Sequence, residues 1–319
     1  MPASDSLPII KMHGAGNDYV YIDERASGVL EDRYDVPALA RAIADRHFGV
    51  GGDGLILVRE AGDGTAAGRM QMFNADGSES EMCGNGLRCV AKLLHDVWHA
   101  DSPARSPLTI ETGNGPLTVD IVESNDGTQV RVDMGPPICE PARIPTTLPA
   151  TSPSGAPVNV PLEVDTSDLP ELAGWDARVT SVSMGNPHAV LFFDDAEAIT
   201  DRVVHTLGPR IENHAAFPNR VNVEFVTTPS RGEFTQRTWE RGSGETLACG
   251  TGACAVMVAG VLNDRLDASA LGQLRGGGLQ LEWAGDASNP APSVFMTGGA
   301  KVVFEGRYPV PSDVPRVNA

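Results

Sequence analysis

The strongest constraint on the fold is an internal repeat whose two copies each span about half of the chain. The segment Cys83-Gly84-Asn85-Gly86 recurs as Cys249-Gly250-Thr251-Gly252, an offset of 166 residues (249 minus 83). Glu79 and Glu245 lie at the same offset. A period of this length has the size of a whole domain rather than of a solenoid unit of roughly 20–50 residues. We therefore expect two similar domains with a site between them.

Earlier parts of the two halves also correspond, with small gaps between them. Gly16-Asn17 precedes an apolar run, as Gly185-Asn186 does in the second half, and Gly54-Leu55-Ile56-Leu57 matches Asn222-Val223-Glu224-Phe225. The boundaries that follow are residues 1–134 for the first domain, completed by a strand at 300–310, and residues 135–299 for the second.

Composition excludes several classes of partner. With 319 residues and 41% hydrophobic content, the chain is long enough for two ordinary cores. Its formal net charge of -18 argues against nucleic acids, which need clustered Lys and Arg, and against an anionic membrane surface. We expect the partner to be a small molecule.

The expected location is the cytoplasm. Met1–Ile10 has neither a basic region nor an apolar core of the kind found in secretion signals, and the sequence lacks a membrane-length apolar stretch. Five cysteines in a chain of this length, an odd number without a secretion signal, favour free thiols over a disulfide framework.

Hydrophobic periodicity predicts mixed α and β structure. The Pro-, Thr- and Ser-rich stretch Gly135–Pro161 is interpreted as the inter-domain connection, and Val310–Ala319 as a tail. Helices are expected at Val36–Arg46, Leu87–His95 (beginning near Asn85), Thr200–Arg210 and Ala253–Leu262. Strands are expected at Leu7–Ile10, Tyr19–Ile22, Leu55–Val58, Leu108–Glu111, Leu117–Ile121, Gln129–Met134, Arg178–Ser183, Ala189–Phe193, Val221–Val226, Glu233–Trp239 and Lys301–Glu305.

Each repeated cysteine stands at the start of an apolar helical run. The first turn of a helix leaves backbone N–H groups unpaired and carries a partial positive charge, which lowers a thiol's pKa and attracts anions. Glycines beside Cys83 and Cys249 allow a substrate to approach the backbone closely. The sequence therefore predicts two reactive thiols, each next to a carboxylate-binding helix end.

Two like thiols facing one substrate are suited to symmetrical proton transfer. One thiolate removes a Cα proton, and the opposite thiol delivers a proton to the other face, which inverts the centre. Helix N–H groups aimed at the substrate carboxylate stabilise the charge that develops. We therefore predict an amino-acid racemase or epimerase without a cofactor.

Metal binding and redox chemistry are two other possible uses of the cysteines. A zinc site built from Cys83, Cys89, Cys249 and Cys254 has poor ligand spacing, because neither pair shares a helix face, so no metal is expected. A redox role would favour Cys-x-x-Cys. Cys89 and Cys254 are expected in helix cores, and Cys139 in a loop.

A pyridoxal mechanism would need a Schiff-base lysine. The three lysines, Lys11, Lys92 and Lys301, lie outside the glycine-rich cysteine loops.

Five motifs together resemble the diaminopimelate epimerase family, in an order and spacing that match across about residues 9–306. This resemblance implies two pseudo-symmetric α/β domains of the α+β type, each a curled mixed sheet or barrel around a central helix, with the active site in the cleft between them. The motifs are Lys11-Met12-His13-Gly14-Ala15-Gly16-Asn17-Asp18, Phe73-Asn74-Ala75-Asp76-Gly77-Ser78, Cys83-Gly84-Asn85-Gly86-Leu87-Arg88-Cys89, Met184-Gly185-Asn186-Pro187-His188 and residues 239–253, which include Glu240-Arg241 and Cys249-Gly250-Thr251-Gly252.

The resemblance also implies an activity, the cofactor-independent interconversion of LL- and meso-2,6-diaminopimelate in lysine and peptidoglycan precursor synthesis, by a protein that forms a possible homodimer. By the family pattern, Cys83 and Cys249 are the catalytic acid and base. His188 is a possible supporting residue. The substrate-binding positions implied are Asn17, Asn74, Gly84, Asn85, Asn186, Asn222, Glu240, Arg241, Gly250 and Thr251.

The chain departs from the family pattern at two positions. Gly54 stands where some members have a polar amide, and Trp239 where some have tyrosine.

Two other functions stay open. One alternative is a proline or hydroxyproline racemase of the same fold. Arg241 and the many amides argue against it, because proline lacks a second charged end. The other is a thiol redox or binding protein without turnover.

Overall fold

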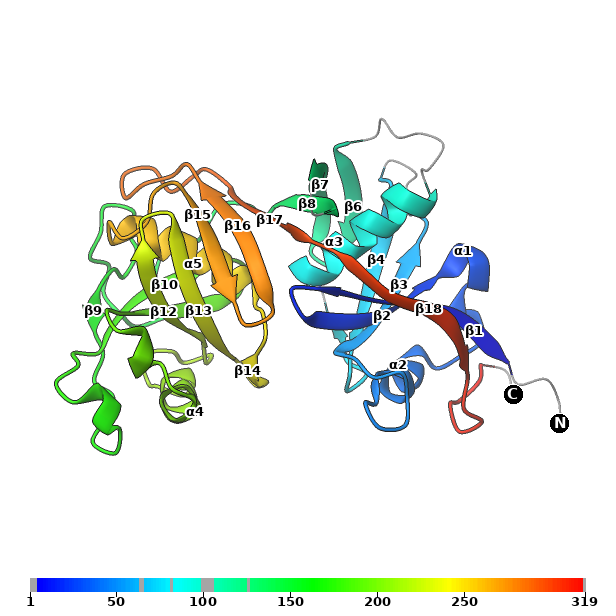
Figure 1. The fold of residues 1–319 in the computed structure, drawn as a ribbon, viewed down its shortest axis with the longest axis horizontal. Helices are drawn as coiled ribbons and strands as arrows, with labels where there is room; N and C mark the ends of the chain where they lie inside the picture. Colours follow the sequence, from blue (N-terminus) through cyan, green and yellow to red (C-terminus); the bar gives the residue numbers. More distant parts are fainter. Residues whose placement is uncertain (1–4, 63–65, 81–82, 99–105, 125–126, 318–319) are drawn as a thin grey trace. The chain divides into compact units, whose positions relative to one another are not determined.

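The polypeptide begins in one unit, forms a second, and returns to complete the first. Unit 1 consists of Met1–Val132 with Gly298–Ala319, and unit 2 of Asp133–Thr297 (Figure 1). The computed structural model describes residues 5–62, 66–80, 83–98, 106–124 and 127–317.

Unit 1 is built on a mixed sheet. Its strands are β1 (Ser6–Gly14), β2 (Asn17–Asp23), β3 (Gly54–Arg59), β4 (Gly68–Asn74), β5 (Glu79–Ser80), β6 (Leu108–Thr112), β7 (Gly115–Ser124), β8 (Gly127–Asp133) and β18 (Lys301–Pro309). Their order is β18-β1-β2-β3-β4-β6-β7-β8, with β5 paired to β4. The β2–β3 and β4–β6 pairs are parallel and the others antiparallel.

Unit 2 has a sheet of the same kind. Its strands are β9 (Val160–Pro161), β10 (Arg178–Ser183), β11 (Pro187–Phe193), β12 (Asn222–Ser230), β13 (Glu233–Glu240), β14 (Gly244–Thr246), β15 (Ser269–Leu274), β16 (Gly277–Trp283) and β17 (Val294–Gly299). Their order is β9-β10-β11-β12-β13-β15-β16-β17, with β14 paired to β13. Here β11–β12 and β13–β15 are the parallel pairs.

The two sheets therefore repeat each other strand for strand. Strands β1 to β8 correspond in order and direction to β10 to β17, and both units place a parallel pair at the same two points. The predicted pair of similar mixed α/β domains is confirmed.

Two long helices pack on each sheet. In unit 1, α3 (Gly84–Leu93) packs against β1, β2 and β7, and α2 (Val36–Ala44) packs against β2, β3 and β4. In unit 2, α5 (Gly250–Leu262) packs against β10, β11, β12, β15 and β16, while α4 (Asp201–Glu212) packs against β12, β13 and β14. The remaining α-helix of unit 1 is α1 (Glu24–Ser27).

Helix α5 is the central element of unit 2 because it is apolar on every side. Its residues from Gly252 to Gly260 are all buried, and a helix without a polar face has to be enclosed. A second core lies on the other side of the sheet, where Val203, Leu207 and Ile211 of α4 are fully buried. The connection predicted at Gly135–Pro161 also packs here, since Leu148 and Val160 join the same core.

Helix α2 ends before the predicted Arg46. The carboxylate of Asp45 accepts hydrogen bonds from the N–H groups of His47 and Phe48 at 2.7 and 2.9 Å. This local turn competes with further helix, as short acidic side chains often do. Among the described residues, no helix is long and apolar enough to cross a membrane.

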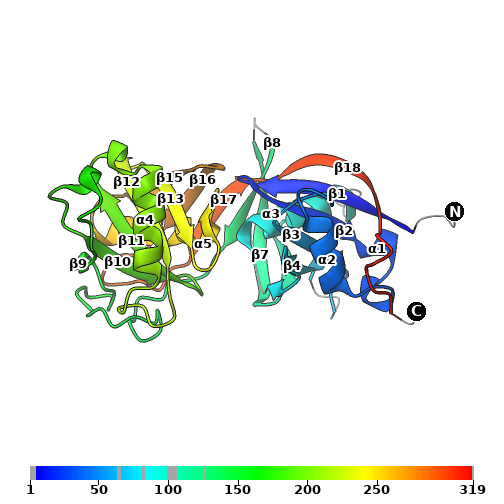
Figure 2. The ribbon, with the colours of Figure 1, turned by 90° about the horizontal axis from the view of Figure 1, so that it is seen from below.

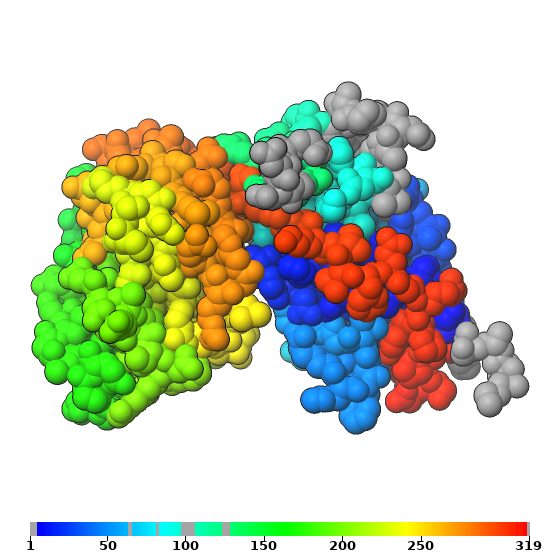
Figure 3. Space-filling view, in the orientation of Figure 1, coloured from blue at the N-terminus to red at the C-terminus, as the bar shows by residue number. Residues whose placement is uncertain are grey.

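The predicted tail is wrong for most of its length. Val310 and Val314 are buried in the core of unit 1, and Arg316 forms an ion pair with Asp5 at 2.8 Å. Just before this segment, β18 runs along β1 (Figure 1 and Figure 2), with Ser6 opposite Pro309. Strand β18 lies at the surface, where Val303 is 56% exposed (Figure 3).

Candidate active site

Cys83 caps the N-terminus of α3. Its backbone is extended, and its Sγ accepts a hydrogen bond from the N–H of Gly86 at 3.5 Å. Gly84 and Asn85 form the first turn and are buried. The thiol therefore occupies the place usually taken by Ser or Asp at a helix start.

Cys249 caps α5 in the same way. Its Sγ accepts from the N–H of Gly252 at 3.3 Å and lies 3.4 Å from the hydroxyl of Thr251. The repeat seen in the sequence is therefore a repeat of local geometry, with one cysteine cap in each unit. The first turn that contains Gly250 supplies the helix N–H groups predicted to bind a carboxylate.

Asn17 faces Cys83, and a chain of hydrogen bonds and one ion pair orients its amide. The thiol donates to Oδ1 of Asn17 at 3.1 Å, and Nδ2 of Asn17 donates to Asp53 at 2.6 Å. Asp53 is in turn paired with Arg46 at 2.9 Å. Because the carboxylate can only accept from Asn17, the amide oxygen has to point toward the thiol. Sequence reasoning missed Asp53, which lies in a glycine-rich loop that resembles an ordinary turn.

The surroundings of Cys249 are more polar and more deeply buried. Suitable ligand atoms of Cys249, His188 and Glu224 all lie within 4.8 Å of one another, and all three residues are buried. Nδ1 of His188 is 2.8 Å from Glu224, and its Nε2 is 3.0 Å from Oδ1 of Asn186. The structure thus brings His188 beside the cysteine, with Asn186 hydrogen-bonded to the histidine, and it adds Glu224, which sequence reasoning did not assign to the site.

The sequence predicts a lowered pKa for the Cys249 thiol at its helix start, and this prediction is wrong. Burial raises the pKa of this thiol well above its usual value, and the charges of Glu240 and Glu224 raise it further. The hydroxyl of Thr251 and the N–H of Gly252 act in the opposite direction but do not overcome burial. A helix N-terminus lowers a thiol's pKa only when desolvation does not outweigh it.

Three other predicted residues of unit 2 cluster at the ends of β12 and β13. Asn222 is buried; its amide donates to the carbonyl of Pro187 at 2.9 Å and accepts from the N–H of Arg241 at 2.9 Å. The guanidinium of Arg241 donates to the carbonyl of Asn219 at 3.1 Å. Glu240 accepts from the hydroxyl of Thr246 at 2.5 Å. Asn222 therefore fixes the backbone from which the Glu-Arg pair projects.

In unit 1, Asn74 and Asn85 are already engaged within the protein. Asn74 donates to Ser78 at 3.0 Å within a turn, and Asn85 accepts from the buried Arg88 at 2.9 Å. Gly54 has a backbone role, because a Cβ there would lie 2.0 Å from the carbonyl oxygen of Phe73. Trp239 donates to Glu212 at 2.8 Å, on the α4 side of the sheet.

A divalent cation would find its ligands at Cys249, His188 and Glu224, the one such group among the described residues. A soft ion such as zinc suits this donor set. However, the Glu224 carboxylate already accepts from His188, Gln236 and Thr238, and these bonds compete with metal. This group shares only Cys249 with the four-cysteine zinc site considered in the sequence analysis, and Cys89 and Cys254 of that set lie buried in their helices.

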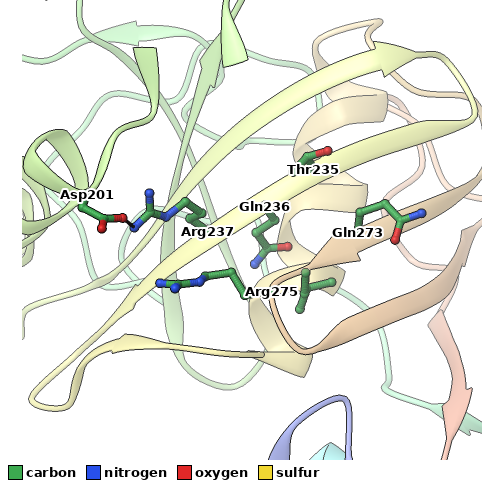
Figure 4. Close-up of a pocket in the computed structure, with 7 residues that line it drawn as sticks. Asp201, Thr235, Gln236, Arg237, Gln273 and Arg275 are labelled. Carbon is green, nitrogen blue, oxygen red and sulfur yellow. Dashed lines mark hydrogen bonds and ion pairs between the residues drawn. The ribbon is translucent and has the colours of Figure 1, made fainter. Parts of the chain in front are cut away.

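A separate pocket of about 330 Å³ opens elsewhere on unit 2. It is lined by Asp201, Thr235, Gln236, Arg237, Gln273, Leu274 and Arg275 (Figure 4). Its two guanidinium groups are paired with carboxylates, Arg237 with Asp201 and both arginines with Glu245. Neither Cys83 nor Cys249 lines this pocket.

Comparison with known proteins identifies the family. The chain matches the family described as diaminopimelate epimerase over residues 9–139 and 180–303. A diaminopimelate epimerase of Leptospira biflexa serovar Patoc is 46% identical over 302 residues, 94% of this chain and 98% of the relative. The chain belongs to the diaminopimelate epimerase family. Members of this family are isomerases.

Solved structures of other enzymes share the fold of this diaminopimelate epimerase family member. A phenazine biosynthesis protein of the PhzF family from Bacillus anthracis has a TM-score of 0.64 and 16% identity, covering 95% of this chain and 99% of the other. A hydroxyproline epimerase from Agrobacterium vitis has a TM-score of 0.63 and 14% identity, covering 98% and 95%. At such identities the likeness concerns the fold alone.

Proposed function

We propose that this chain converts LL-2,6-diaminopimelate to meso-diaminopimelate, without a cofactor, through Cys83 and Cys249. Its product would serve lysine and peptidoglycan precursor synthesis. The observation that carries the chemistry is the cysteine cap found on the matching helix of each unit. Family membership supports the choice of substrate.

The reaction needs only two proton transfers. The thiolate of one cysteine takes the Cα proton and becomes a thiol, while the thiol of the other gives its proton to the opposite face and becomes a thiolate. No redox change occurs, and the reverse reaction uses the same two groups with their protons exchanged. N–H groups in the first turns of α3 and α5 are suited to hold the substrate carboxylate, where charge develops.

The substrate's second, unreactive end explains the remaining predicted contacts. Diaminopimelate carries a second ammonium and a second carboxylate, which need an acidic partner and a planar donor. Glu240 and Arg241 are adjacent and partly or fully exposed at the end of β13, so they fit these roles. Asn17, Asn74, Asn85, Asn186 and Asn222 are proposed to complete the binding surface.

A Schiff-base cofactor is not part of the proposal. Lys11 is buried and forms an ion pair with Asp18 at 2.6 Å, and Lys92 is paired with Asp96 at 2.6 Å. Both amino groups are therefore engaged by carboxylates, whereas a Schiff base requires an amine that is free to react. Proton transfer by the thiols accounts for the inversion without an electron sink.

Incubation of the reduced protein with LL-diaminopimelate in deuterium oxide tests the proposal. We expect meso product with solvent deuterium at Cα and no requirement for an added cofactor. L-proline and trans-4-hydroxy-L-proline are assayed in parallel, because the hydroxyproline epimerase fold is shared. Turnover of either imino acid with none of diaminopimelate would reassign the substrate, and no deuterium in any of them would favour a redox or binding role.

A further inference from the structure

Helix α3 contains a fully buried arginine one turn after its start. The side chain of Arg88 is 0% exposed, and its neighbours Leu87 and Cys89 are buried as well. A guanidinium in such a place has lost its hydration, which is costly unless hydrogen bonds within the protein replace the water. The groups that Arg88 binds should therefore show why a cation is kept here.

The repeat shows that packing alone does not require this arginine. At the offset of 166 residues, Arg88 corresponds to Cys254 (254 minus 88) and Asn85 to Thr251. Cys254 is fully buried in α5, and a buried cysteine behaves as a small hydrophobic residue. The same place on the other central helix is thus filled without a charge. The guanidinium of Arg88 therefore serves a feature that is specific to unit 1.

Two hydrogen bonds of Arg88 reach different parts of unit 1. Its Nη2 donates to Oδ1 of Asn85 at 2.9 Å, within the first turn of α3. Its Nε donates to the carbonyl of Gly299 at 3.3 Å. Gly299 belongs to residues 298–300, the return segment, where the chain has come back from unit 2. One guanidinium thus joins the first turn of the central helix to the return segment.

Gly14, at the end of β1, leaves the space that this arrangement needs. A Cβ on Gly14 would lie 2.9 Å from Nη2 of Arg88 and 3.0 Å from the carbonyl oxygen of Asn85. Both contacts would be too close, so a side chain here would push the guanidinium and the helix turn away from β1. The bond between Arg88 and Asn85 therefore depends on a glycine at this position.

Unit 2 holds its incoming chain in a different way. Ser183 corresponds to Gly14 at the offset of 169 residues that relates Gly16 to Gly185 (183 minus 14 and 185 minus 16). The N–H and carbonyl of Ser183 pair with the backbone of Ile138 at 3.0 and 2.8 Å, soon after the chain has entered unit 2. In unit 1 a side chain makes the bond to the incoming chain, and the same side chain also holds the helix turn.

We propose that Arg88 is a positioning residue that holds the carboxylate-binding first turn of α3 against the return segment. The proposal rests on the proposed function, in which the N–H groups of Gly84 and Asn85 bind the substrate carboxylate. A guanidinium suits this task because its donors lie in one plane and point in fixed directions. Without it the turn can shift, and the substrate carboxylate is bound less tightly. Arg88 itself acts through the turn and not on the substrate.

Steady-state kinetics with LL-diaminopimelate tests this role. Arg88→Met keeps a long side chain but removes its donors, and we expect KM to rise about tenfold or more while kcat falls by a smaller factor, because displaced N–H groups weaken substrate binding. A merely structural role would lower the amount of folded protein, and with it kcat, at an unchanged KM. Folded Arg88→Met protein with the wild-type KM overturns the proposal.

Arg59→Met is the matched control. Arg59 is another largely buried arginine of unit 1, with a side chain 14% exposed, but it pairs with Glu24 and Glu31. Its replacement should leave KM at the wild-type value. Arg88→Lys separates geometry from charge, because an ammonium keeps the charge without the planar fork. KM should stay raised in Arg88→Lys, and a wild-type KM would show that charge alone is sufficient and would contradict the positioning role.

Gly14→Ala tests the same contact with the arginine in place. Its Cβ would displace Nη2 of Arg88 and the backbone of Asn85, so KM should rise as in Arg88→Met. This variant decides the question if Arg88→Met does not fold, and a wild-type KM in Gly14→Ala then overturns the proposal. Gly299→Ala is its control, because a Cβ there would meet no described atom within 4 Å and should leave KM unchanged.

Hydrogen exchange tests the proposal without a substrate. The N–H of Leu87 donates to the carbonyl of Cys83 at 2.8 Å in α3, and the N–H of Ala253 makes the matching bond to Cys249 at 2.9 Å in α5. In Arg88→Met, exchange at Leu87 should become about tenfold faster or more while Ala253 keeps its wild-type rate, because local opening is confined to the α3 turn.

An equal change at both amides, or no change at Leu87, overturns the proposal. If the protein turns over no diaminopimelate, the proposed function fails, and the exchange at Leu87 still decides whether Arg88 holds the first turn of α3.

Discussion

At the scale of single residues, the two caps divide the reaction between thiols with different surroundings. Cys83 faces a neutral amide held by Asp53, and Cys249 faces a buried histidine and glutamate. Both thiols also accept a helix N–H, which a serine hydroxyl can do equally well. Replacing either sulfur by oxygen should therefore spare the helix and impair the chemistry.

Cys83→Ser and Cys249→Ser should each lower the epimerisation rate by about a hundredfold or more, the usual contribution of a general acid or base. Cys139 provides the control. It is a buried thiol in neither helix cap, and Cys139→Ser should keep the wild-type rate. Rates with LL-diaminopimelate, together with circular dichroism, check this; equal activity in all three variants would refute the assignment.

Glu245 should contribute a pH-dependent part of the stability. Burial alone would raise its pKa, but hydrogen bonds from Arg237, His205 and Arg275 outweigh burial and lower the pKa to about 2. Because the folded pKa lies below the unfolded value, the stabilisation is present above about pH 4.5 and is lost as the pH falls toward 2.

The corresponding measurement is urea unfolding at neutral pH and near pH 3. Glu245→Gln should lower the free energy of unfolding at neutral pH by about 1–2 kcal/mol after allowance for solvent screening. Near pH 3 the difference from wild type should shrink. A difference that does not change with pH would show that Glu245 stabilises the fold by packing rather than by charge.

At the scale of elements, each central helix meets its sheet at a glycine in the first turn. A Cβ on Gly252 would press against Glu224, which three donors hold in place, whereas a Cβ on Gly86 would meet the end of the Ile56 side chain. The first contact is the more rigid of the two. The helix in unit 2 therefore has less freedom to shift.

Gly252→Ala should cost about 1–3 kcal/mol of unfolding free energy, as overpacking usually does. Gly86→Ala should cost less. Gly232→Ala is a control, because its Cβ would come only within 4.0 Å of Ser230. Thermal unfolding of the three variants ranks their losses of stability. A smaller loss of stability for Gly252→Ala than for Gly86→Ala would contradict the view that the contact of Gly252 with Glu224 is the more rigid one.

Local sequence patterns were sufficient for most elements but not for the full site. Strand Arg178–Ser183 has the predicted bounds, and both cysteine caps could be predicted because a helix start has a local signature. Glu224 could not, because one acidic residue in the apolar strand Val223-Glu224-Phe225 gives no sign of the residues on β11 and β13 that pair with it. The burial of Val314 likewise depends on partners distant in the sequence.

At the scale of the whole molecule, the proposed chemistry requires one cysteine from each unit to reach the same substrate. A disulfide forms only when two Cα atoms come within about 7 Å. Oxidation of the free protein therefore tests whether the units can approach closely enough. The expected homodimer stays a prediction, which analytical ultracentrifugation can check.

Mild oxidation should inactivate the protein by joining Cys83 to Cys249, and a reductant should restore full activity. Peptide mapping under non-reducing conditions identifies the bond. Cys139→Ser should be inactivated in the same way. Inactivation that a reductant does not reverse, or a bond to a different cysteine, would count against a shared site.

The return of the chain to unit 1 fixes an order of assembly during synthesis. Unit 2 is a continuous stretch, Asp133–Thr297, whereas the edge of β1 that faces away from β2 pairs with β18, whose last residue Pro309 lies opposite Ser6. A growing chain on the ribosome can therefore complete unit 2 while the first strand it made still has an open edge. Until β18 leaves the exit tunnel, that edge of β1 is available for pairing with other chains, so a message truncated just before β18 should yield an aggregating product rather than a merely less active one.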